Sequence, residues 1–146
     1  MKHFYSVILV PFLIILILFG CEKPSSDWVK YNSDDDGNVY SYKKGEIDKD
    51  GIRQVWIQIV YSDKGREKEI QSKIENGEST EGYDKLLKTE TLVEVECKKQ
   101  RRRILFIIDT DKDRKKLFSE DNNKPEWSYI IPDSLGEELF LKTVCK

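Results

Sequence analysis

Ile-Arg-Gln-Val-Trp-Ile-Gln-Ile-Val-Tyr, residues 52–61, is the stretch of this sequence that decides the fold class. Every second residue in its second half is apolar: Val55, Ile57, Ile59 and Tyr61. Gln54 and Gln58 lie at positions between them. Successive side chains of a β-strand point to opposite faces of a sheet, so this alternation predicts a strand with one buried face and one polar face.

The same pattern, followed outward in both directions, predicts further strands at residues 28–32, 39–42, 89–97, 103–110 and 127–131. In the stretch 89–97, alternation places Cys97 on the same face as Val93 and Val95, which we expect to be the core face. Residues 104–108 are apolar on both faces, as in a central strand. A polar loop is expected at 119–126, and the charged segment 66–76 predicts a surface helix that ends at Gly77.

The last elements are expected to be a strand and then a helix. Ser134 and Glu137 have the spacing of a capping box, which marks a helix start. An apolar stripe follows at helical spacing: Leu135, Leu139, Phe140, Thr143 and Val144. The predicted fold class is α+β, mainly β: an antiparallel sheet with a C-terminal helix packed on one face.

Length and charge limit the classes of function. A chain of 146 residues has room for one domain. Without the first twenty residues, which contain one basic residue and no acidic one, 25 − 1 = 24 basic and 27 acidic groups remain, a net charge of −3. This balance argues against a nucleic-acid partner. The only histidine is His3, so the rest of the chain has no imidazole for nucleophile activation or metal ligation. We therefore expect a non-enzymatic protein without cofactor or metal.

The amino terminus predicts export. Residues 4–19 carry no charge, and as a helix they would reach only about 24 Å, short of the ~30 Å hydrocarbon core of a bilayer. This length suits a signal peptide better than a transmembrane anchor. Leu18-Phe19-Gly20-Cys21 resembles the lipobox of bacterial lipoproteins, which implies that Cys21 is acylated and becomes the first residue. The alternative is an uncleaved anchor with an incidental cysteine.

These features divide the chain into a signal peptide (1–20), a lipidated tether (21–27) and a folded domain (28–146). Acyl chains on Cys21 would bind membrane lipid lastingly, since several chains are buried together. Glu22 stands where lipoproteins retained in the inner membrane often have Asp, which favours the outer membrane. Two further cysteines, Cys97 and Cys145, remain in an oxidising compartment where disulfides persist. They are either bonded to each other or two free buried thiols.

Three local patterns suggest binding sites. The first is a concentrated basic run, which is either a site for polyanions or a solvated face: Lys98, Lys99, Arg101, Arg102 and Arg103. Alternation along a strand would separate Arg102 from its two neighbours. The second, residues 109–113 with Glu120, imitates a calcium loop, but Arg114 replaces the required glycine, which favours a polar β-turn. The third is the set of three tryptophans at positions 28, 56 and 127, which we expect in the core rather than in a carbohydrate platform.

Several of these features occur in an order that resembles the surface-adhesin protein E-like family of bacterial lipoproteins. The residues that carry the resemblance are the Val55-Trp56 strand, Ser79-Thr80-Glu81-Gly82-Tyr83-Asp84, the strand ending in Cys97, Glu126-Trp127-Ser128-Tyr129-Ile130, Pro132-Asp133-Ser134 and the closing Val144-Cys145. The likeness covers about residues 27–145. It implies an antiparallel sheet with a packed helix, a Cys97–Cys145 bridge and display at the cell surface.

The leading hypothesis is therefore a membrane-anchored lipoprotein that acts as a surface-displayed, adhesin-like binding module. The resemblance implies an extracellular or envelope protein, or a glycan, as partner. The alternative is a structural envelope lipoprotein that faces the periplasm. The sequence leaves the oligomeric state open.

Overall fold

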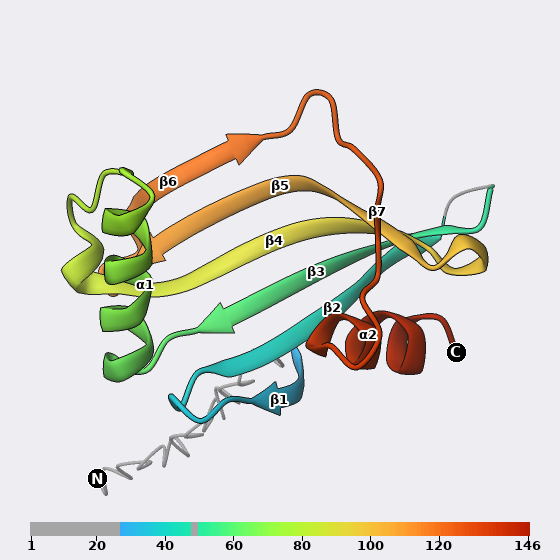
Figure 1. Cartoon of the computed structure of the whole chain (residues 1–146), viewed down its shortest axis with the longest axis horizontal. Helices are drawn as coiled ribbons and strands as arrows, with labels where there is room; N and C mark the ends of the chain where they lie inside the picture. Colours follow the sequence, from blue (N-terminus) through green and yellow to red (C-terminus); the bar gives the residue numbers. More distant parts are fainter. Residues whose placement is uncertain (1–26, 48–49) are drawn as a thin grey trace, which may run out of the picture.

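The alternating stretches of the sequence form one antiparallel sheet in a computed structural model that describes residues 27–47 and 50–146 (Figure 1). Its seven strands follow the order β1-β2-β3-β4-β5-β6, and β7 pairs with β5 beside β6. The strands are β1 (Val29–Ser33), β2 (Val39–Ile47), β3 (Ile52–Val60), β4 (Leu86–Glu96), β5 (Arg101–Asp111), β6 (Lys116–Asp121) and β7 (Ser128–Tyr129). The predicted signal peptide, Cys21 and residues 22–26 of the tether lie outside the described residues. The predicted fold class is confirmed.

The core lies on one face of this sheet, as the alternation in residues 52–61 predicts. Val55 is fully buried and opposes Val93 across the β3–β4 pair, and Val95 is buried on the same face. Several strand boundaries differ from the prediction: β4 begins three residues earlier, and β7 is confined to Ser128–Tyr129. Two other differences are extensions. β2 extends to Ile47, and β6 continues to Asp121, within the stretch that was expected to be a polar loop. In both cases pairing with a neighbouring strand supplies backbone hydrogen bonds that polar side chains do not prevent.

Helix α1 (Asp63–Glu75) starts three residues before the predicted segment. The Ser62 hydroxyl caps it by accepting a hydrogen bond from the Gly65 amide at 2.9 Å. Asn38, at the β1–β2 turn, accepts a bond from the Ser62 amide at 3.0 Å. Lys64 and Lys68 form ion pairs with Asp36 at 2.7 and 2.6 Å. The acidic turn therefore fixes the start of α1 against the sheet.

The C-terminal helix covers the core at the other end of the sheet. It comprises α2 (Leu135–Leu139) and a π-helical turn, η3 (Phe140–Val144). Ser134 caps it by accepting a bond from the Glu137 amide at 3.1 Å, and the Glu137 carboxylate accepts one from the Asp133 amide at 2.9 Å. Three residues of the predicted stripe are buried: Leu139, Phe140 and Val144. Leu135 is 40% exposed, contrary to prediction, because it lies at the first turn, before the helix meets the core.

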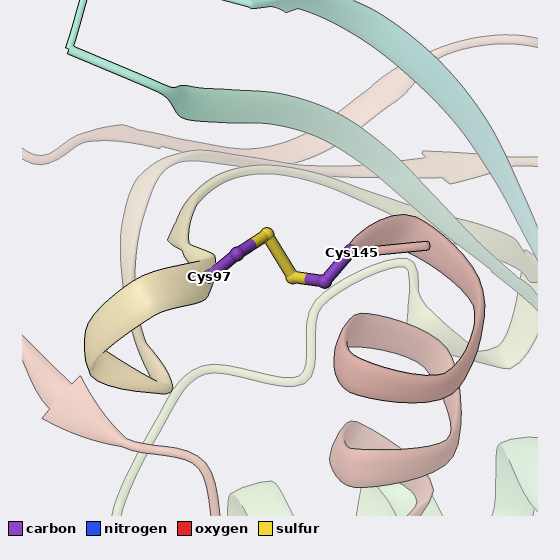
Figure 2. Close-up of a disulfide and its surroundings, with 2 residues drawn as sticks. All are labelled: Cys97 and Cys145. Atoms are coloured by element: carbon purple, nitrogen blue, oxygen red, sulfur yellow. A yellow bond between two sulfur atoms is a disulfide. The ribbon is translucent and has the colours of Figure 1, made fainter.

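Cys97 and Cys145 form a disulfide with their Cα atoms 5.6 Å apart, which excludes the alternative of two free thiols. Cys97 begins a short 3-10 turn, η2 (Cys97–Lys99), after β4, and Cys145 directly follows η3 (Figure 2). The bond therefore ties the end of the chain to the β4–β5 connection. Both cysteines pack against the core cluster, as the strand alternation of Cys97 predicts.

The calcium-like stretch at 109–113 is a turn between β5 and β6. The Asp111 carboxylate accepts bonds from the amides of Asp113 and Lys115 at 2.8 and 2.7 Å. Arg114 adopts a left-handed conformation with φ of 64°, which normally favours glycine. The Asp111 carboxylate is thus used inside the turn, and the described residues contain no cluster of three or more groups suited to a metal ion.

The contact between Gly65 and Asn38 yields a stability prediction. A Cβ atom on residue 65 would lie 1.8 Å from the Asn38 side-chain oxygen. Gly65→Ala should lower the free energy of unfolding by about 1–3 kcal/mol through overpacking, although alanine is the better helix former. In the control Gly136→Ala, the nearest atom would be 3.4 Å away, so stability should not fall. Chemical denaturation measures both, and a Gly65→Ala protein as stable as wild type would contradict the docking of α1.

Candidate binding surfaces

The predicted basic run lies at the tip of the β4–β5 hairpin, and the structure divides it. Lys98 and Lys99 are exposed in η2. Arg102 points to the core face, where its guanidinium lies 5.7 Å from the centre of the Phe140 ring. Arg101 and Arg103 lie on the opposite face. The five cations therefore do not form one continuous patch, as strand alternation predicts.

Arg101 and Arg103 form a clamp around Trp127. Each guanidinium carbon lies 4.5 Å from the centre of the indole ring, a geometry that favours cation–π attraction. Each guanidinium also pairs with a glutamate across the β4–β5 ladder: Arg101 with Glu96 at 2.5 Å and Arg103 with Glu94 at 2.6 Å. These arginines hold the segment before β7 against the sheet. The sequence missed this role because Trp127 is more than twenty residues away along the chain.

A third cation, Lys99, shares Glu96 with Arg101. Lys99 pairs with Glu96 at 2.9 Å. This bond lowers the pKa of the Glu96 carboxyl, and Arg101 acts in the same direction. Glu96 is therefore a carboxylate at neutral pH, so it offsets part of the positive charge of the basic run.

A cleft of about 500 Å³ lies between α1, the segment 78–83 and β6. The Lys73 side chain, only 12% exposed, forms its inner wall and pairs with Glu78 at 3.0 Å. The Lys73 ammonium also lies 4.8 Å from the centre of the Tyr83 ring and 5.6 Å from that of Phe118. Lys115 and Lys116 also line the cleft, which therefore carries charges of both signs beside apolar walls such as Phe118.

Beneath the cleft lies a buried polar network. Asp109 accepts hydrogen bonds from the hydroxyls of Tyr83 and Thr89 at 2.5 and 2.6 Å. Burial raises the pKa of Tyr83, and the Asp109 carboxylate raises it further. In the part of the chain that the structure describes, every buried polar side-chain atom has a partner. Through Tyr83, this network anchors the segment 79–84, which is one of the stretches that carry the family resemblance.

The second face of the sheet carries a shallow hollow of about 360 Å³, which we call the aromatic hollow. Its lining residues are Trp28, Lys43, Trp56, Glu90, Phe106 and Ile108. The rings of Trp56 and Phe106 meet edge to face, with centroids 6.1 Å apart. The expectation that the tryptophans belong to the core is wrong. All three are only partly buried, and the core cluster forms on the other face.

The geometry defines an α+β domain with one covered and one open sheet face. Its three surface features are the divided basic run, the cleft beside α1 and the aromatic hollow. A family model described as surface-adhesin protein E matches residues 28–146. The chain belongs to this family, which confirms the resemblance seen in the sequence. No curated protein and no solved structure matches the chain. Among the described residues, no helix is long and apolar enough to cross a membrane.

The divided basic run predicts weak binding of polyanions. Because Lys99, Arg101 and Arg103 are paired with glutamates, the wild-type domain should elute from a heparin column below about 0.15 M salt, where exposed charges are screened beyond ~8 Å. Replacing both glutamates (Glu94→Gln, Glu96→Gln) releases these cations and should raise the eluting salt concentration. Elution of the wild type well above 0.15 M salt would instead support the polyanion site.

Proposed function

We propose that this protein is a non-enzymatic lipoprotein, anchored in the outer membrane through an acylated Cys21, whose domain is displayed at the cell surface as an adhesin-like binding module. The observation that carries the proposal is the match to the surface-adhesin protein E family over residues 28–146. The lipobox-like residues 18–21 support the anchor. The proposed partner is an extracellular or envelope protein or a glycan.

The arrangement of the domain supports binding rather than catalysis. The buried carboxylate Asp109 is engaged by two hydroxyl groups, and the Lys73 ammonium is paired with Glu78. These groups are held in fixed pairs, and their contacts stabilise the walls of the cleft. A preformed, charged cleft of this kind suits a polar segment of a partner protein.

The second candidate is a structural envelope lipoprotein that faces the periplasm. The same acylated cysteine and the same stable domain serve either role, because the side of the membrane is decided by sorting and not by the fold. The two candidates differ in whether the domain is accessible from outside the cell.

Protease treatment of intact cells separates them. We expect added protease to remove the protein from intact cells while a periplasmic marker protein stays whole. In the same cells, mass spectrometry should find the lipid on a peptide that begins at Cys21. A protein that is degraded only after the outer membrane is opened would instead face the periplasm. A mature protein that keeps residues 1–20 would contradict the anchor.

A further inference from the structure

We infer that the aromatic hollow is a membrane-docking surface that rests on the lipid bilayer in which the protein is anchored. This inference rests on the proposed anchor at Cys21 and adds an orientation to it. The hollow lies on the sheet face opposite the core, and its apolar walls are Trp28, Trp56, Phe106 and Ile108.

The length of the tether places the hollow close to the membrane. Cys21 precedes Trp28 by 28 − 21 = 7 residues, and seven extended residues span at most about 25 Å. Asp27 forms an ion pair with Lys43 at 2.8 Å, at the edge of the hollow. The chain thus enters the domain at the hollow itself, since Trp28 is one of its walls. An acylated Cys21 would keep this part of the surface within reach of the lipid headgroups.

The chemistry of the hollow suits the boundary between headgroups and acyl chains. Indole rings prefer this region because they are amphipathic, with a large apolar surface and one polar N–H group. The charges at the rim are compensated: Lys43 pairs with Asp27, and Glu90 pairs with Lys88 at 2.9 Å. Neither ion pair would therefore bring a net charge to the acyl chains.

Docking through this face would orient the domain. The aromatic hollow and the core lie on opposite faces of the sheet. The cleft lies on the core side, where Phe118 of β6 stands directly opposite Asp109 of β5 in the strand register. A domain that rests on the hollow would turn α1 and the cleft away from the bilayer. The proposed partner-binding side would then be the accessible one.

Fluorescence quenching by brominated lipid tests this inference. The mature chain from Cys21 is coupled through that cysteine to a maleimide phospholipid in vesicles. The vesicles consist of phosphatidylethanolamine and phosphatidylglycerol, and some of these lipid molecules carry bromine on their acyl chains. Cys21 is the only free thiol, because Cys97 and Cys145 are bonded to each other. The tryptophan emission should shift to the blue and be quenched. Because Trp28 and Trp56 are walls of the hollow, quenching should fall clearly below that of wild type in Trp28→Phe/Trp56→Phe, which keeps only Trp127, and persist in the control Trp127→Phe.

Circular dichroism establishes that each variant is folded. Equal quenching in wild type and Trp28→Phe/Trp56→Phe, or none in wild type, would overturn the inference. A blue shift caused by a neutral oligosaccharide, without quenching by bromolipid, would overturn it too and assign the hollow to a glycan. Because the coupling is chemical, this result does not depend on acylation in the cell, so it is separate from the test of the proposed anchor.

Discussion

The bond between Cys97 and Cys145 is the constraint on which the rest of the structure depends. It joins residues 48 positions apart and ties the last turn of the chain to the β4–β5 connection. In the chain-entropy model, closing a loop of this length stabilises a fold by about 4 kcal/mol. The residues held in place by this bond are core residues, since Leu139, Phe140 and Val144 cover Val55 and Val93. Without the terminal helix, one end of the apolar face would be exposed to water.

The two faces of the sheet differ in exposure because the helices cover only one of them. α1 contacts this face at one end, where Lys73 approaches Asp109, and the terminal helix covers the other end. Figure 1 shows both helices in front of the sheet, at opposite ends. The second face keeps Trp56 and Phe106 partly exposed. In the proposed function, this division lets one face meet the membrane while the other meets a partner.

The fold could be predicted from local patterns, because period-two alternation and capping residues report directly on local structure. Residues 52–61 and Ser134 are clear cases. The start of α1 could not be predicted because Gly65 is a poor helix former. Glycine is required at this position because it leaves room for the Asn38 side chain, and only the tertiary structure brings these two residues together. The tryptophans were misplaced for a related reason: alternation tells which residues share a face, but not which face the helices cover. The clamp of Arg101 and Arg103 on Trp127 likewise joins segments that are distant in sequence.

The central claim is that the disulfide holds the terminal helix over the core, and hydrogen exchange of Cys97→Ala/Cys145→Ala tests it most directly. We predict that the amides of residues 135–144 lose protection first, while those of β3 and β4 remain the slowest to exchange. We also predict that the free energy of unfolding falls by about 2–5 kcal/mol, the usual cost of removing a native disulfide. Unchanged stability, with the terminal helix as protected as in wild type, would contradict the account.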